Sequence, residues 1–361
     1  HADAQFNLGV MYATGRGVAQ DASQAVAWYH KAAAQGHADA QFNLGVMYAT
    51  GEGVAQDDKQ AVAWYRKAAE QGDADAQSLL GVMYATGEGV AQDDKQAVAW
   101  YHKAAAQGHA DAQFKLGVMY ATGEGVAQND KQALAWTRKA AAQGHANAQF
   151  KLGVMYFKGE GVAQNDKQAA AWFRKAAGQG DADAQSLLGV MYATGRGVAQ
   201  DASQAVAWYR KAAEQGDADA QLNLGVMYDE GRGVAQDASQ AAAWYHKAAA
   251  QGHANAQSLL GLMYATGEGV AQDDKQAVAW TRKAAEQGHA IAQFKLGVMY
   301  VKGEGVAQDF LQAYAWSSSA AANGYSDAVK NRDLIAKRLT PTALAEGQKL
   351  ATRYVEQYQP K

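Results

Sequence analysis

The chain has 361 residues and a formal net charge of −3, so it has no strongly basic surface to attract nucleic acid. No apolar run approaches the ~20 residues that a membrane-spanning helix needs. The sequence contains no cysteine, which excludes disulfides, thiol catalysis and zinc–thiolate sites.

A unit of 36 residues repeats along the chain and is stronger than any other pattern. At residues 37–72 it reads HADAQFNLGVMYATGEGVAQDDKQAVAWYRKAAEQG. Nine copies start at His1, His37, Asp73, His109, His145, Asp181, Asp217, His253 and His289. They fill residues 1–324, and residues 325–361 form a tail that does not repeat. A fixed period between 20 and 50 residues is typical of solenoids and propellers.

The first half of each unit predicts an α-helix, which in the second copy covers residues 38–49. Its apolar residues recur at helical spacing and share one face: Ala40, Leu44, Met47 and Tyr48. Gly51 and Gly53 are expected to end this helix, because glycine adopts the left-handed conformation without a steric penalty.

The second half of the unit predicts another helix, with Asp57 as N-cap and Gln60 in the position of a capping box. Its expected buried stripe contains Ala61, Trp64 and Ala68, with Tyr65 as a further candidate. The alternation typical of β-strands is missing. One hairpin cannot bury both of its apolar faces alone, so the repeats predict an all-α solenoid of stacked hairpins.

The unit resembles the Sel1-like repeat, a relative of the tetratricopeptide repeat. The residues that carry the resemblance in the second copy are Leu44-Gly45, Tyr48, Gly51-x-Gly53-Val54, Asp57, Ala61, Trp64, Lys67-Ala68-Ala69 and Gly72. The resemblance implies a right-handed α/α superhelix of nine repeats whose first helices line a concave groove. It also implies an adaptor or assembly protein, of a kind that is often bacterial and exported. One branch of the family has disulfide-linked repeats, and its activities are not carried over to this cysteine-free chain.

The two ends of the chain differ from the repeats. The chain begins at the first position of a unit without an initiator methionine, so we expect a leader upstream, with or without an earlier repeat. A periplasmic or secreted location is therefore favoured over the cytoplasm. The tail, residues 325–361, predicts one helix at residues 327–339 and another that starts at Thr340-Pro341. We expect these helices to cap the ninth repeat, and the protein to be a monomer.

Unit positions 3, 6, 10 and 13 lie opposite the buried face of the first helix, and most of them vary between copies. They predict three patches in the groove. One is aromatic, with a neighbouring lysine: Phe114, Phe150, Phe157 and Lys158, with Val154 between the last two phenylalanines. One is acidic: Asp219, Asp229 and Glu230. One is apolar: Ile291, Phe294, Val298 and Val301. These residues could anchor a partner peptide or helix, or they could only pack between adjacent first helices.

Other residues suggest chemistry but are better explained by structure. A tryptophan recurs in every unit at helical spacing, as core residues do, although such rings could also bind sugars. Histidine pairs such as His30 and His37 lack the three or four ligands of a metal site. Position 10 is valine, or Leu262, so the Lys/Asn carboxylate clamp of chaperone-docking tetratricopeptide domains cannot form. We expect neither a cofactor nor a metal, and no catalytic constellation stands out.

Two functions from different classes follow. The first is a non-catalytic adaptor that binds a protein or peptide along the groove. The alternative is a module that binds cell-wall glycan and tethers an envelope enzyme.

Overall fold

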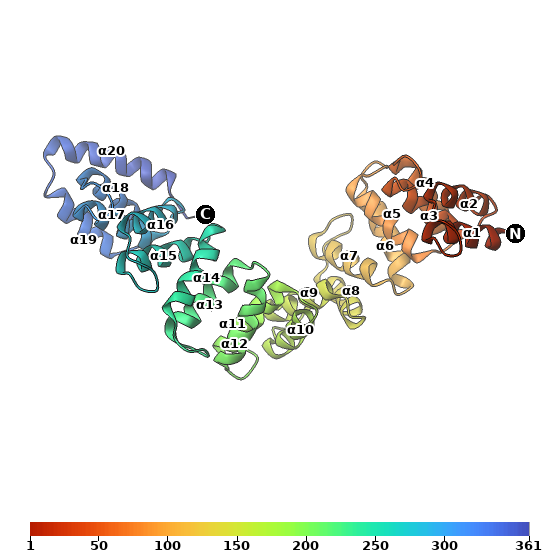
Figure 1. Ribbon diagram of the computed structural model, residues 1–361, viewed down its shortest axis with the longest axis horizontal. Helices are drawn as coiled ribbons and strands as arrows, with labels where there is room; N and C mark the ends of the chain where they lie inside the picture. Colours follow the sequence, from red (N-terminus) through yellow and green to blue (C-terminus); the bar gives the residue numbers. More distant parts are fainter. Residues whose placement is uncertain (361) are drawn as a thin grey trace. The chain divides into compact units, whose positions relative to one another are not determined.

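The computed structural model describes residues 1–360, in which helices are joined by loops and no strand occurs (Figure 1). These residues form twenty helices. Their bounds are α1 (Ala2–Thr14), α2 (Ala22–Ala34), α3 (Ala38–Thr50), α4 (Asp58–Glu70), α5 (Ala74–Thr86), α6 (Asp94–Ala106), α7 (Ala110–Thr122), α8 (Asp130–Ala142), α9 (Ala146–Lys158), α10 (Asp166–Gly178), α11 (Ala182–Thr194), α12 (Ala202–Glu214), α13 (Ala218–Glu230), α14 (Ala238–Ala250), α15 (Ala254–Thr266), α16 (Asp274–Glu286), α17 (Ala290–Lys302), α18 (Phe310–Ala322), α19 (Asp327–Ala336) and α20 (Pro341–Gln357). The predicted all-α class is confirmed, with two helices in each of the nine repeats.

Local hydrogen bonds explain where the helices of a repeat begin and end. His37 caps α3, because its Nδ1 accepts a hydrogen bond of 3.3 Å from the Ala40 amide. Gly51 ends α3 with a left-handed φ of 73°. The Asp57 carboxylate caps α4 by accepting from the Gln60 amide at 3.1 Å. The Asp57 amide itself donates to the Tyr48 carbonyl at 2.9 Å, so half of the predicted capping box is replaced by a bond that closes the loop.

The second glycine of the loop is required by a neighbouring repeat. A Cβ atom on Gly53 would lie 2.3 Å from the carbonyl oxygen of Ala22, at the start of α2. The backbone therefore passes too close to the preceding repeat for any other residue. This contact fixes the loop of one repeat against the second helix of the one before it.

The core lies between the second helix of one repeat and the first helix of the next. Leu44 and Met47 on α3 pack with Ala25, Val26 and Tyr29 on α2. Leu44 is fully buried, which stabilises the fold by about 1.5–3 kcal/mol. Because this core crosses the boundary between the first and second repeats, these two hairpins hold each other in place.

The prediction for the buried stripe of the second helix was partly wrong. Tyr65 is a full core residue with 4% of its surface exposed, whereas Trp64 is only half-buried. Tyr65 turns inward because Gly45 leaves room for its ring: a Cβ atom on Gly45 would lie 2.5 Å from the ring. The tryptophan packs at the edge of the core that the preceding second helix forms.

A ladder of buried glutamines also joins the repeats. Gln41 Nε2 donates to the Ala33 carbonyl of the preceding repeat at 3.2 Å, and Gln41 Oε1 accepts from Gln71 Nε2 at 2.7 Å. The same pair of bonds recurs further along, for example from Gln257 to Ala249 and from Gln287 to Gln257. Each rung satisfies polar groups that would otherwise be buried without a partner.

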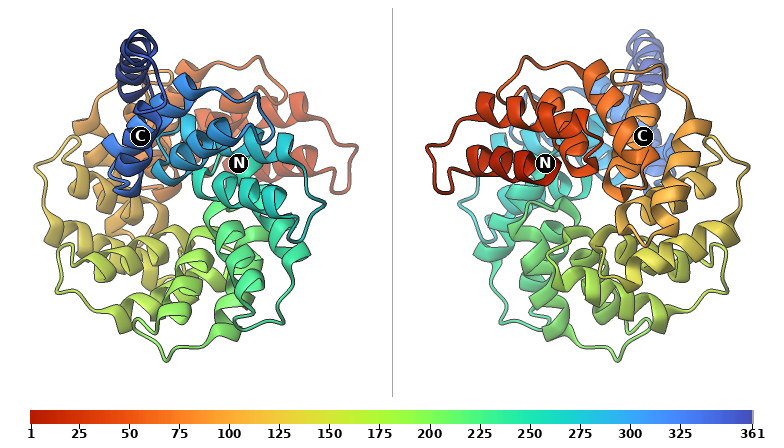
Figure 2. Two further views of the ribbon diagram at one scale, coloured as in Figure 1. Left: turned by 90° about the vertical axis from the view of Figure 1, so that its left-hand side faces the viewer. Right: turned by 90° about the vertical axis from the view of Figure 1, so that its right-hand side faces the viewer.

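The chain forms two compact units, one of residues 1–179 and one that begins at Gly180. The first unit contains α1–α10 and the second α11–α20, and each is built of successive hairpins (Figure 2). Within residues 1–360, no helix combines the length and the apolar character that crossing a membrane requires.

The tail packs against the ninth repeat, where α20 lies along α18 (Figure 1). Its rings cover Trp316: the centroids of Tyr354 and Tyr358 lie 4.6 and 5.0 Å from that of Trp316. The Tyr358 carbonyl also accepts bonds of 3.0 Å from Gln293 Nε2 and Asn323 Nδ2, and so joins the end of the glutamine ladder. α19 ends at Ala336, three residues earlier than predicted. That the tail stabilises the array as a cap stays a prediction.

Candidate partner-binding surface

The first helices present residues of unit positions 6, 10 and 13 on one side, which we call the first-helix face. In the second repeat these are Phe42, Val46 and Ala49. All three are half-buried, and they pack on the core that contains Tyr65. Each side chain is thus held by its own repeat and still keeps part of its surface accessible.

The fifth repeat carries an aromatic cluster on this face, made of Phe150, Phe157 and Phe173. Phe150 and Phe157 on α9 both contact the fully buried ring of Phe173 on α10, at centroid distances of 5.8 and 6.3 Å. Both α9 rings are half-buried. Two of the three predicted aromatic residues, Phe150 and Phe157, thus meet through the ring of Phe173, which sequence analysis did not identify.

Phe114, the third predicted aromatic residue, has a different neighbour. It stacks on the imidazole of His145 at 4.9 Å, with an angle of 29° between the rings. His145 Nε2 lies 2.7 Å from a carboxylate oxygen of Asp111. Phe114 is therefore fixed by the cap of the next first helix and is not in contact with Phe173 in the way that Phe150 is.

The predicted lysine of this patch is solvent-exposed. Lys158 Nζ lies 3.8 Å from Glu160, which also pairs with Lys151 at 3.6 Å. Val154 is half-buried between Phe150 and Phe157 along α9. The cluster is therefore an apolar surface with a mixed-charge edge.

The predicted acidic residues are each held by a separate partner. Asp219 lies 3.0 Å from His253 Nε2, and Glu230 lies 2.9 Å from Arg232. Asp229 accepts a bond of 3.3 Å from the Tyr245 hydroxyl. Burial, and then the charge of Asp229, raise the pKa of Tyr245 above its usual range. Much of the negative charge of these residues is thus compensated locally.

The apolar residues of the ninth repeat lie on α17. Ile291 is 44% exposed, while Phe294, Val298 and Val301 are half-buried. The ring of Phe294 lies 5.0 Å from that of Tyr325, just before the tail helices. Phe294 and Val298 also line a pocket of about 250 Å³ between the eighth and ninth repeats.

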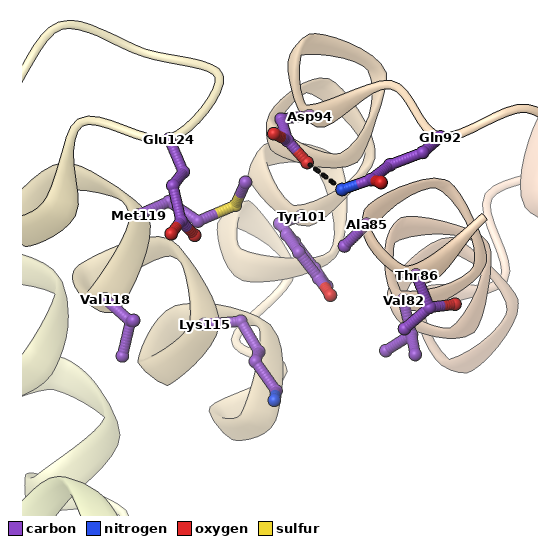
Figure 3. Close-up of a pocket in the computed structure, with 10 residues that line it drawn as sticks. All are labelled: Val82, Ala85, Thr86, Gln92, Asp94, Tyr101, Lys115, Val118, Met119 and Glu124. Atoms are coloured by element: carbon purple, nitrogen blue, oxygen red, sulfur yellow. Dashed lines mark hydrogen bonds between the residues drawn. The ribbon is translucent and has the colours of Figure 1, made fainter.

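The corresponding pocket between the third and fourth repeats is shown in Figure 3. It has a volume of about 330 Å³ and contains the side chains of Tyr101, Lys115 and Glu124. It extends to the loop, where Gln92 Nε2 donates to the Asp94 carboxylate at 3.5 Å. Between the eighth and ninth repeats, the equivalent loop side forms an adjoining pocket of about 290 Å³. The first-helix face is therefore hollowed at the same register in both units.

The repeated tryptophans have one face occupied. In eight repeats the lysine three residues later places its Nζ 3.9–4.2 Å from the centre of the ring, as Lys67 does on Trp64. Trp100 and Trp316 are buried, and the other seven are half-buried. Within residues 1–360, no three side chains of the histidine, aspartate and glutamate types gather closely enough to hold a metal ion.

Sequence analysis missed Phe173 and Thr281, which are buried on the second helices next to this face, and Lys295, which lines the same pocket as Thr281. Phe173 and Thr281 occupy the unit position of Tyr65, which was only a secondary candidate for the core. The glycine at position 9, opposite that tyrosine, was the available signal. Its strict repetition suggests that a ring packs against it.

Comparisons with known proteins give one consistent result. The model of the Sel1 repeat family matches nine times, at residues 2–37, 38–73, 74–109, 110–145, 146–181, 182–217, 218–253, 254–289 and 290–325. A protective antigen of uropathogenic Escherichia coli, which displays an SLR fold, is 40% identical with a TM-score of 0.69, covering 99% of this chain and 84% of its own. A Sel1 repeat protein from Oxalobacter formigenes is 38% identical with a TM-score of 0.64, covering 84% of this chain and 87% of its own. No curated protein sequence matches.

Proposed function

The chain belongs to the Sel1 repeat family, and from that premise we propose that it is a non-catalytic adaptor that binds a partner peptide or helix on its first-helix face. Repeats of this family generally form protein-interaction modules. The proposal rests above all on the aromatic cluster of the fifth repeat. There Phe150 and Phe157 keep accessible surface while the buried ring of Phe173 holds both of them.

Such an arrangement suits binding because the anchors are already ordered. Aromatic side chains that are fixed before binding lose little conformational freedom when a partner covers them. Two such rings can supply several kcal/mol, and aromatic anchors commonly dominate interfaces. The neighbouring Lys158, Lys151 and Glu160 provide a polar edge around the apolar surface.

The glycan-binding alternative has less support. Sugar platforms need an open aromatic face with polar groups beside it. The faces of the repeated tryptophans are occupied instead by lysine ammonium groups, such as Lys67 on Trp64. The rings of the fifth-repeat cluster also have mostly apolar neighbours, which favours a peptide.

The test is capture of partners from cells of the source organism with the tagged chain and with the double variant Phe150→Ser/Phe157→Ala. This variant introduces the residues that the third repeat carries at the same positions, Ser78 and Ala85, so we expect it to fold. Capture should fall about tenfold while helicity by circular dichroism stays unchanged.

Arg138→Ala is the matched control, since Arg138 is exposed on the second helix α8, outside the first-helix face. Capture that survives the double variant but is lost with Arg138→Ala would place binding on the other side of the repeats. Capture of cell-wall fragments in place of protein would favour the glycan module.

A further inference from the structure

The pocket between the eighth and ninth repeats differs chemically from the rest of the first-helix face. It lies within the second unit and is lined by Leu262 of α15, Thr281 of α16 and Phe294, Lys295 and Val298 of α17, among others. Its volume of about 250 Å³ is large enough for one bulky side chain. Leu262 is 41% exposed and widens the apolar rim, at a position that is valine in every other repeat.

Two core side chains that are large in other repeats are small in the eighth repeat. Thr281 stands at the unit position that carries a tyrosine or phenylalanine ring in six repeats. Ser258 stands where Phe42 and Phe150 cover that ring. The fourth repeat also has a threonine here, Thr137, but it keeps a phenylalanine at position 6. The eighth repeat is the one in which both large residues are replaced by small ones.

Polar groups in the pocket lack partners. Thr281 is fully buried, and its hydroxyl oxygen has no hydrogen-bond partner. Lys295 is half-buried, and within residues 1–360 no carboxylate pairs with it. The nearby Lys302 differs, because it lies 3.3 Å from Glu304. Burial lowers the pKa of Lys295, in agreement with an ammonium that has lost water without gaining a counter-charge.

An unpaired ammonium beside an apolar cavity selects a particular chemistry. A carboxylate would supply the missing counter-charge, and charge-assisted bonds are about twice as strong as neutral ones. An aromatic or long aliphatic group would occupy the apolar part of the pocket beside Leu262, Phe294 and Val298, and would gain contacts with its walls. An anion without an apolar group would satisfy only the first requirement.

We propose that this pocket binds a partner peptide through an apolar side chain that lies next to a carboxylate, with the apolar group against Leu262, Phe294 and Val298 and the carboxylate on Lys295. The proposal rests on the adaptor function and specifies the chemistry of the partner at one place on the first-helix face. It predicts a preference for acidic–apolar segments over basic ones.

The experiment uses a small probe with the same two groups, 3-phenylpropionate, on the full chain with methyl-labelled methionine. Met299 lines the pocket, so its methyl resonance in carbon–proton NMR spectra should shift with a dissociation constant on the order of 1 mM. The uncharged 3-phenylpropanamide should bind about tenfold more weakly, and propionate, which lacks the ring, should not bind detectably.

Two variants follow the residues of other repeats and are expected to fold. Thr281→Tyr places a ring, as in the second repeat, at a position that lines the pocket, and should weaken the probe at least about tenfold. Lys295→Asn copies Asn43 and Asn223, and should abolish the difference between the carboxylate and the amide. Thr137→Tyr is the matched control and should leave probe binding unchanged.

Equal affinity for the two ring probes, or a probe affinity that Thr281→Tyr leaves unchanged, would overturn the proposal. The same holds if no Met299 shift appears. If Thr281→Tyr does not fold, the affinities of Lys295→Asn for the carboxylate and amide probes still test the proposal. Probe binding requires no partner, so it can be measured independently of capture. If the probe binds while partner capture does not depend on Phe150 and Phe157, the adaptor site on the fifth repeat is refuted and the pocket proposal is not.

Discussion

The second and eighth repeats share nearly all of their sequence and differ in how they fill one space. In the second repeat, Tyr65 packs on Gly45 and is covered by Phe42 at 5.8 Å. In the eighth, Thr281 and Ser258 stand in these places, and Thr281 lines a pocket. The helix caps, buried leucines and glutamine ladder are the same in both. The comparison teaches that the frame of the repeat does not depend on its largest core ring, so that ring is free to vary.

The ninth repeat differs from the others because the tail packs on it. Removing the last helix of the tail is the change from which we expect the largest effect. Ending the chain after Thr340 would expose Trp316 and leave Gln293 and Asn323 without the Tyr358 carbonyl. We expect a loss of several kcal/mol in the last repeats, together with lower solubility. Thermal unfolding and analytical ultracentrifugation measure both effects. A truncated chain that stays monomeric with the same Tm would show that residues 341–361 are not a cap.

The next test makes the second repeat resemble the eighth. Tyr65→Thr would leave a cavity between α3 and α4 and should lower the free energy of unfolding by about 3 kcal/mol. Urea unfolding measures the loss, and hydrogen exchange should locate it in the second and third repeats, because stability in stacked repeats is local. A loss below about 1 kcal/mol would mean that the ring adds little to the frame.

Paired glycine substitutions sharpen the same comparison. An added methyl group at Gly45 would lie 2.5 Å from the buried Tyr65 ring, so Gly45→Ala should cost about 1–3 kcal/mol. At Gly261 the closest atom is the Thr281 hydroxyl oxygen at 2.4 Å, which can rotate away. Since alanine is also the better helix former, Gly261→Ala should cost less than about 1 kcal/mol. Equal losses in urea unfolding would contradict this interpretation.

The smallest expected effect concerns pH. Asp3 lies 3.5 Å from His37 at the start of the second repeat, whereas for His289 at the start of the ninth repeat the residue equivalent to Asp3 is Asn255. Burial, and then repulsion by Lys295, lower the pKa of His289 below its usual 6.5. A lowered pKa favours the neutral form in the folded chain. The stability it contributes is therefore complete above pH 6.5 and is lost as the pH falls through the lowered value.

Asn255→Asp should reduce this acid loss by a few tenths of a kcal/mol, because a carboxylate would stabilise the protonated imidazole. Unfolding curves at neutral pH and at about pH 5.5 would detect it. Asp39→Asn is the control, because the repeat that follows Asp39 begins with Asp73 and not with a histidine. A variant with the same pH dependence as the parent chain would show that His289 does not respond to this position.

Much of the fold follows from the sequence, because a ninefold repetition multiplies each weak signal. The caps at Asp57 and Gly51 and the buried Leu44 were predicted correctly. The exchange of Trp64 and Tyr65 arose because neighbouring helix positions differ by only 100°, so both lie near a broad apolar stripe. Which of them turns inward depends on Gly45, in the other helix of the hairpin.

The candidate site was less predictable for a similar reason. Phe150 and Phe157 could be placed on one helix face by spacing alone, but their contact with Phe173 depends on the pairing of α9 with α10. The pocket beside Thr281 is lined by residues of α15, α16 and α17. A periodic pattern indicates what each repeat contains, and it does not indicate which pockets lie between two repeats. Whether the predicted residues bind a partner stays a prediction.

The glutamine ladder has a consequence for how such a chain can change over time. Each rung uses one side chain from its own repeat and a carbonyl from the one before, at a spacing that is identical from Gln41 to Gln257. Duplication or loss of 36 residues at a stroke therefore leaves every rung intact, wherever the crossover falls. A gain or loss of another length within the eight residues that a rung spans would leave a glutamine amide buried without its partner. Genetic recombination can thus lengthen or shorten this array in whole units, and can place a variant repeat such as the eighth at a new position without disturbing its neighbours.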